Sequence, residues 1–216
     1  MSMAWMRMPG QTWPVAAAAF VAMWTAMMIA MMLPSLVPML GRYRQAVDRV
    51  GAARLDVLTA VVAIGYFAVW SALGAAIFPL GAVLAVAQMR LPALARAVPI
   101  AAGVVVMLAG AVQLTAWKAR HLAFGRDTAR VRALPADAGA AWRHGVCLGV
   151  HCSYCCAGLT ASFLALGVMD LRVMAVVTVA ITVERLAPAG ARVARVVGVV
   201  GIGAGVQLIT RAVGSG

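Results

Sequence analysis

Charge is scarce in this chain, and acidic charge is the scarcest. Charged residues make up 11% of the 216 residues, six are acidic, and Glu184 is the single glutamate, whereas 64% of the residues are hydrophobic. So few polar side chains cannot cover the surface of a soluble protein of this size. Disorder is excluded as well, because disordered chains are poor in apolar residues. The composition therefore predicts an integral membrane protein that associates with the lipid bilayer.

Signatures of soluble enzymes are also missing. The sequence contains no G-x-S-x-G elbow, no Walker loop and no H-E-x-x-H motif. Glu184 has no second intramembrane carboxylate to pair with for acid–base chemistry, so the sequence gives no positive reason to expect an enzyme. The formal net charge of +12 would indicate nucleic acid in a soluble protein. In so apolar a chain it indicates membrane orientation instead, and no nucleic-acid partner is expected.

Cysteine occurs only four times, and all four residues fall between Cys147 and Cys156. They are too few and too clustered for a secreted disulfide framework. A cleavable signal peptide is not expected either, because the apolar run after Arg7 continues without a charge to Leu40. That run is longer than the apolar part of a signal peptide. The first apolar segment is therefore expected to remain as a helix.

Charge-free runs set the expected membrane spans, since about 20 apolar residues are needed to cross the hydrocarbon core as a helix. They predict an all-α, polytopic transmembrane helix bundle of about six helices, with residues 1–216 forming a single integral membrane domain. The apolar run of the second helix continues through residues 78–89, which contain Pro79 and are too short to cross again. We expect an interfacial or re-entrant piece there. The six expected helices cover residues 13–33, 57–77, 98–117, 144–169, 171–187 and 193–210.

The basic residues are unevenly shared among the loops of this arrangement. Most of the 18 Lys and Arg residues fall in the first, third and fifth loops. The positive-inside rule makes these loops cytoplasmic and puts both termini outside. The segment 118–143 is then the one substantial cytoplasmic loop.

The fourth expected helix concentrates the side chains that bind soft metals. At about 100° per residue, Cys152 and Cys156 stack on the flank of a longer stripe, and inward-facing polar groups are the rule in a membrane. The stripe predicts a metal site, with buried packing of small thiols as the alternative. Its members follow steps of three, four and four residues: His144, Cys147, His151 and Cys155.

Methionine is the second chemical theme, in the first expected helix. Met23, Met27 and Met31 recur at steps of four, as do Met28 and Met32. Thioethers suit Cu(I), although methionine is more often a packing residue.

The methionines of the first helix and the start of the fourth helix are expected at the same depth in the membrane. If the first helix runs from outside to inside, Met31 and Met32 lie near its cytoplasmic end, where the fourth helix begins with His144 and Cys147. The sequence therefore predicts one shared cavity on the cytoplasmic side.

Glu184 lies near the cytoplasmic end of the fifth expected helix, beside Arg185. A carboxylate in lipid must be paired, interfacial or functional. A salt bridge at the membrane rim is one reading. An inward-facing Glu184 would instead be a hard metal ligand, a proton acceptor or a partner that orients a histidine.

These residues resemble a known family. The sequence reads W-x-x-M-x-x-A-M-M-x-P from Trp24 to Pro34, and a second block joins the cysteines to Glu184 and Pro188. The pattern is similar to bacterial multi-pass proteins grouped as domain of unknown function 2182, described as predicted metal-binding integral membrane proteins. The resemblance implies metal binding in the bacterial cytoplasmic (inner) membrane. The second block contains Gly149, Cys152, Cys155, Cys156, Gly167, Met169, Met174 and Glu184.

One stretch departs from that family pattern. Its members carry Lys-x-x-Cys-Leu-x-x-Cys after the third helix, whereas here Lys118 and Leu122 are kept and the cysteine positions hold His121 and Gly125. His121 preserves one ligand, so the resemblance implies a mixed thiol and imidazole site.

The leading hypothesis is a membrane protein that binds a soft transition metal, copper as Cu(I) or else zinc, for transport, insertion or homeostasis. A metallochaperone or a membrane protein would be its partner. The alternative is a thiol–disulfide or quinone-linked redox protein that uses Cys152 and Cys155. Haem binding is disfavoured, because His144 and His151 lie on one face of one helix and cannot clamp both faces of a haem.

Overall fold

The chain folds into helices connected by short segments. The computed structural model describes residues 5, 7, 10–47, 50–127 and 135–214, and no strand occurs among them. The all-α prediction is confirmed, and five of the helices, α1, α2, α3, α5 and α7, are long and apolar enough to cross a membrane. The helices of the described residues are α1 (Trp13–Ala46), α2 (Ala52–Arg90), α3 (Pro92–Gln113), α4 (Ala116–Asp127), α5 (Ala138–Leu166), α6 (Leu171–Leu186) and α7 (Gly190–Gly214).

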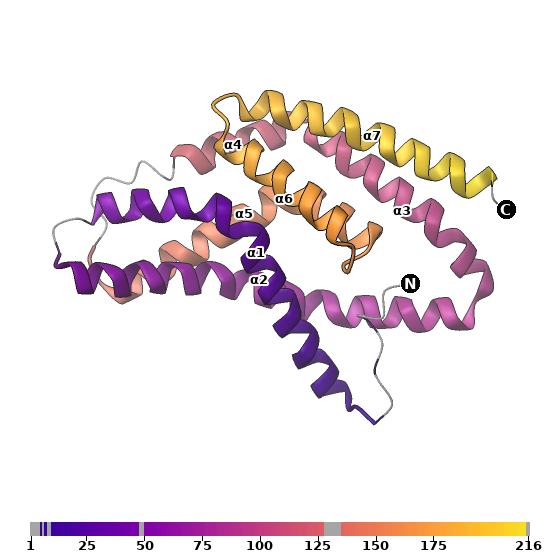
Figure 1. The fold of residues 1–216 in the computed structure, drawn as a ribbon, viewed down its shortest axis with the longest axis horizontal. Coiled ribbons are helices and arrows are strands. Elements are labelled where there is room, and N and C mark those ends of the chain that lie inside the picture. Colours follow the sequence, from indigo (N-terminus) through magenta and orange to yellow (C-terminus); the bar gives the residue numbers. More distant parts are fainter. Residues whose placement is uncertain (1–4, 6, 8–9, 48–49, 128–134, 215–216) are drawn as a thin grey trace.

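Helix α1 is longer than its sequence predicts. It starts at Trp13, with Pro14 in its first turn, where a missing amide proton costs nothing. It then continues past the expected end at Leu33, through Pro34 and Pro38, to Ala46. Proline inside a helix removes a backbone hydrogen bond and bends the helix without necessarily ending it. Figure 1 shows the change of direction within α1.

Helix α2 also runs through a proline, and it corrects one expectation. Residues 78–89 are not a separate interfacial or re-entrant piece, because Pro79 lies inside one continuous helix of 39 residues. At 1.5 Å per residue this helix is about 58 Å long, roughly twice the hydrocarbon thickness.

Two helices are too short to count as spans. Helix α6 has 16 residues and covers the fifth expected segment, but its length of about 24 Å falls short of the roughly 30 Å hydrocarbon core. Asp170 caps its start by accepting hydrogen bonds from the amides of Arg172 (2.8 Å) and Val173 (3.2 Å). Helix α4, with 12 residues, occupies the first part of the 118–143 segment.

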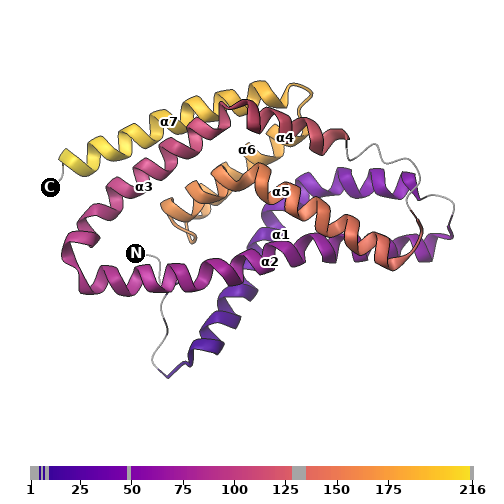
Figure 2. The same ribbon diagram turned by 180° about the vertical axis from the view of Figure 1, so that it is seen from behind.

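Glycines allow the closest helix contacts. Helices α3 and α7 lie side by side in Figures 1 and 2. A Cβ on Gly198 would come 2.8 Å from the carbonyl oxygen of Gly110, and one on Gly205 would come 2.7 Å from that of Gly103. The missing side chains at Gly198 and Gly205 therefore let α7 pack closely against α3.

Glycines also allow α2 and α5 to pack closely. A Cβ on Gly145 would collide with the carbonyl of Val62, and one on Gly149 would lie 2.8 Å from the carbonyl oxygen of Tyr66. These contacts fix Tyr66 against the cysteine-bearing face of α5.

Helix α6 lies in the middle of the molecule, between α1 and α2 on one side and α3 and α7 on the other, and α5 runs from the middle toward one end alongside α2 (Figures 1 and 2). Two tryptophans anchor α1 to α2, because the indole nitrogen of Trp24 donates to the carbonyl of Trp70 at 2.9 Å. Thr25 and Ser71 add a hydroxyl contact at 2.9 Å one position further along each helix. The core therefore holds the methionine-bearing part of α1 against the centre of the bundle.

Candidate metal centre

Three of the four cysteines are buried in the middle of α5. Cys152 is 0% exposed, Cys156 2% and Cys155 7%. The sulfur atoms of Cys152 and Cys156, one helical turn apart, lie 3.8 Å from each other. All four cysteines are free thiols. Two soft ligands therefore face the same small volume.

A thioether from α1 joins them. Met32, which is fully buried, places its Sδ atom 4.0 Å from the Sγ of Cys152. Two sulfur ligands on one metal, at a metal–sulfur bond of about 2.3 Å, lie about 3.8 Å apart in tetrahedral and about 4.0 Å apart in trigonal geometry. The two sulfur separations at Cys152 match those values, so each of these neighbours lies at a distance at which it could share a soft metal ion with Cys152.

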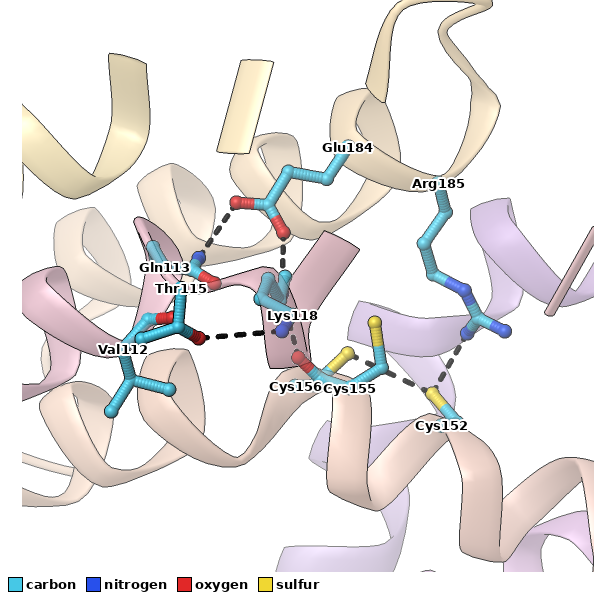
Figure 3. Close-up of polar contacts among 9 residues, drawn as sticks. All are labelled: Val112, Gln113, Thr115, Lys118, Cys152, Cys155, Cys156, Glu184 and Arg185. Atoms are coloured by element: carbon cyan, nitrogen blue, oxygen red, sulfur yellow. Dashed lines mark hydrogen bonds and ion pairs between the residues drawn. The ribbon is translucent and has the colours of Figure 1, made fainter. Parts of the chain in front are cut away.

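The guanidinium of Arg185 sits on the same thiol. Its Nη1 atom donates to the Sγ of Cys152 at 2.7 Å, and Figure 3 shows the side chain reaching from α6 toward the cysteines. Nη1 also lies 3.4 Å from the hydroxyl of Ser35, and Nη2 lies 3.3 Å from the Sδ of Met39. Arg185 thus connects α6 to the thiols and to the bent part of α1.

Tyr66 supplies a second donor to that sulfur. Its hydroxyl donates to the Sγ of Cys152 at 2.9 Å, and the whole side chain is buried. Two hydrogen-bond donors, one of them cationic, favour the thiolate form of Cys152. Because thiolates rather than thiols bind metals, these donors prepare the sulfur for coordination.

Glu184 forms a buried ion pair, and its partner is Lys118 of α4. The Lys118 Nζ lies 2.8 Å from the Oε2 of Glu184, with side-chain exposures of 1% and 2%. Gln113 donates to Oε1 at 2.7 Å, and Lys118 also donates to the carbonyl of Cys155 at 2.6 Å (Figure 3). Both carboxylate oxygens are therefore engaged away from the thiols, deep in the protein and not at a rim.

The charge of Lys118 is secured by its surroundings. Burial disfavours the ammonium form, but the neighbouring Cys155 thiol and Glu184 carboxylate outweigh that effect and raise the pKa of Lys118 above its ordinary value. The ion pair and its hydrogen bonds therefore connect four helices: α4 through Lys118, α6 through Glu184, the end of α3 through Gln113 and α5 through the Cys155 carbonyl.

Two of the three predicted histidines pack against aromatic side chains. His144 is half-buried and stacks on Tyr43 with ring centroids 5.5 Å apart. The ring of His121 packs at a tilt against that of Trp117, with centroids 4.2 Å apart, and its Nδ1 lies 2.9 Å from the Trp117 carbonyl oxygen. His151 is half-buried. Among the described residues, no group of three or more His, Cys, Asp or Glu side chains is arranged to hold a metal ion.

The remaining predicted ligands differ in how deeply they are buried. Cys147 is exposed, so the inward edge of α5 is offset from the predicted stripe and runs through Cys152 and Cys156. On α1, Met31 is buried and Met27 half-buried. The first and fourth predicted helices do meet, but at Met32 and Cys152, not at Met31 and Cys147.

Sequence reasoning missed the roles of Arg185, Lys118 and Tyr66. Neighbouring residues on a helix point about 100° apart, so adjacent Glu184 and Arg185 must serve different partners. The adjacency of Glu184 and Arg185 was therefore a usable signal, because it means that one of these two side chains reaches away from the other toward a different buried partner. The acceptor could not be identified without the fold.

The redox alternative, with Cys152 and Cys155 as a reactive pair, stays a prediction. The thiol that lies 3.8 Å from Cys152 is that of Cys156, four residues along, and all the cysteines are free.

The fold and this site define a class: an all-helical protein with five helices able to cross a membrane and a buried group of sulfur side chains. The chain belongs to the PpoB2 family, described as copper chaperones, whose family model matches residues 21–208. No curated protein and no solved structure matches the chain. The family supports a copper-related function with a copper ion as partner, and it gives no support to the zinc alternative.

Proposed function

We propose that this protein is an integral membrane copper carrier that binds Cu(I) between Cys152, Cys156 and Met32. The observation that carries the proposal is the pair of sulfur separations at Cys152, 3.8 Å to Cys156 and 4.0 Å to Met32, in a chain of a copper chaperone family. Thiolate and thioether are the ligands that favour Cu(I) among the biological metals.

The surroundings of the sulfur atoms suit a cargo ion. The site is closed to solvent, since Cys152 and Met32 are 0% exposed, and a dry sulfur site protects Cu(I) from water. Its ligands come from two helices, α5 and α1, and Pro34, which removes a backbone hydrogen bond from α1, lies two residues after Met32. A small shift of α1 would remove one ligand and loosen the ion, which a carrier needs for release.

The stripe on α5 supplies a route to this site. Exposed Cys147 lies one turn before half-buried His151, which adjoins Cys152. We assign Cys147, His151 and His144 to entry or exit of copper, with Cys155 and Met31 as buried neighbours of the binding ligands. His121, Met27 and Glu184 receive no coordinating role in this proposal.

The cellular setting completes the proposal. The whole chain would form one domain in the bacterial cytoplasmic membrane, with the basic segment between α1 and α2 and residues 118–143 facing the cytoplasm by the positive-inside rule. A metallochaperone or membrane protein would exchange copper with it for transport, insertion or homeostasis.

Titration of detergent-purified protein with Cu(I), under a reductant and against a chromogenic Cu(I) chelator, tests the proposal. We expect wild-type protein to compete for one ion per chain. Cys147→Ser should do the same at equilibrium, because an exposed thiol on the entry route would change the rate of loading and not the affinity of the buried ligands. The double variant Cys152→Ser and Cys156→Ser should lose that competition. Full competition by the double variant would refute the assignment of the two thiols.

A further inference from the structure

The guanidinium of Arg185 is placed where a bound metal would feel its charge. It lies 2.7 Å from the Cys152 sulfur and also contacts Met39 and Ser35. The side chain is half-buried, and the thiols that it faces are almost wholly buried. A cation in such surroundings needs a permanent partner, because an uncompensated charge away from water is costly.

The other buried charges near the thiols cancel one another. Lys118 and Glu184 form their own ion pair at 2.8 Å, with Gln113 on the second carboxylate oxygen. Among the described residues, Arg185 is the charged side chain that donates a hydrogen bond to a cysteine sulfur. Once a bound metal has displaced the protons of Cys152 and Cys156, the charge of the sulfur group would be set by these two thiolates, the metal ion and Arg185.

This arrangement distinguishes metal ions by charge. A monovalent ion bound by two thiolates and a neutral thioether gives a complex of charge −1, which the guanidinium neutralises. A divalent ion with the same ligands gives a neutral complex and leaves the charge of Arg185 without a counter-charge. Both ions could satisfy the sulfur geometry, so charge is what separates them.

We propose that Arg185 is a specificity-determining residue that makes the buried sulfur site selective for a soft monovalent ion over divalent ions. The inference rests on the proposed Cu(I) site and adds to it the means by which a closed thiolate site rejects Zn²⁺ and Cd²⁺, ions that thiolates otherwise bind well. The guanidinium does not touch the metal; it acts by holding Cys152 and by balancing the charge of the complex.

The first test compares Ag⁺, a redox-stable monovalent probe, with Zn²⁺ on detergent-purified protein by isothermal titration calorimetry. Arg185→Gln should lower the preference for Ag⁺ over Zn²⁺ by about 10- to 100-fold, the value of a hydrogen bond between charged groups. Arg185→Lys keeps the charge and should stay much nearer to wild type. Arg192→Gln removes an equal charge from an exposed position on α7 and should leave the preference unchanged.

The second test changes the charge of the ligands and leaves Arg185 in place. Met32→Cys replaces a neutral thioether with a third thiol, which adds one negative charge to each metal complex. The monovalent complex then keeps a negative charge even with Arg185 included, whereas the divalent complex is neutralised by Arg185. The preference should move toward Zn²⁺, in the same direction as for Arg185→Gln. This variant keeps the proposal testable if Arg185→Gln does not yield monodisperse protein.

The outcomes separate the two claims. A wild-type protein that binds neither Ag⁺ nor Cu(I) would contradict the proposed function. Binding by the wild type, with an unchanged ratio of Ag⁺ to Zn²⁺ affinity in Arg185→Gln and Met32→Cys, would overturn the role of Arg185 alone. An equal loss of both metals in Arg185→Gln would also overturn it, because a merely structural residue would produce that result.

Discussion

Replacing Lys118 by methionine removes the partner of a buried carboxylate. The ion pair between Lys118 and Glu184 is 2.8 Å long and almost wholly buried, so in Lys118→Met the charge of Glu184 keeps only the hydrogen bond from Gln113. Breaking a buried pair in this way costs about 3–5 kcal/mol. For a chain of this length that corresponds to a fall of about 6–20 °C in the unfolding midpoint.

The measurement is thermal stability of detergent-purified variants, followed by fluorescence-detected size-exclusion chromatography. Arg44→Met is the matched control, because the Arg44–Asp56 pair is as short, at 2.6 Å, but has side-chain exposures of 41% and 65%. An exposed pair contributes about 0–1 kcal/mol, so this control should stay close to wild type. Adding Glu184→Gln to Lys118→Met removes the orphaned charge and keeps an acceptor for Gln113, so most of the lost stability should return.

Two results would refute this reasoning. One is a loss of stability in Lys118→Met no larger than in Arg44→Met. The other is a double variant no more stable than Lys118→Met alone, which would mean that the unpaired carboxylate is not the source of the cost.

Three further predictions follow from the contacts of the site. Tyr66→Phe removes the hydroxyl that donates to Cys152 and should weaken Cu(I) binding about tenfold in a chelator competition, with little change in stability; unchanged affinity would contradict the role of that donor. Gly149→Ala places a methyl group against the backbone of Tyr66 and should destabilise the protein. Its control, Gly203→Ala, faces open space and should be neutral or slightly stabilising, because alanine has the higher helix propensity. Equal effects of the two variants on the unfolding midpoint would argue against close packing of α2 on α5. In native protein, maleimide should label exposed Cys147 and spare the three buried thiols, as mass spectrometry would report, and rapid labelling of Cys152 would contradict its burial.

Much of the helical architecture could be predicted from the sequence, because length and hydropathy decide which segments can cross a bilayer. The ends of the helices could not. A proline ends many helices in water, but in α1 and α2 the chain continues through Pro34 and Pro79. Within an apolar bundle, neighbouring helices can support the backbone that proline interrupts. Local sequence therefore overstates the power of proline to divide these long segments.

The sulfur side chains that meet in the candidate site could be singled out from the sequence, whereas the partners of the charged side chains beside them could not. Cys152, Cys156 and Met32 stand out because soft ligands repeat at helical spacing. The partners of Arg185 and Lys118 depend on how α6 and α4 pack against α5, and no periodicity within one segment encodes that packing. The exposure of Cys147 was missed for the same reason, since only neighbouring helices decide which edge of α5 faces inward.

X-ray absorption spectroscopy at the copper edge of the Cu(I)-loaded, detergent-purified protein tests the central claim most directly. A site formed by Cys152, Cys156 and Met32 predicts a monovalent copper ion surrounded by two or three sulfur atoms, a signal lost in the double variant Cys152→Ser and Cys156→Ser. A coordination shell made of nitrogen, as His144 or His151 would supply, or an unchanged sulfur shell in the double variant, would contradict the account.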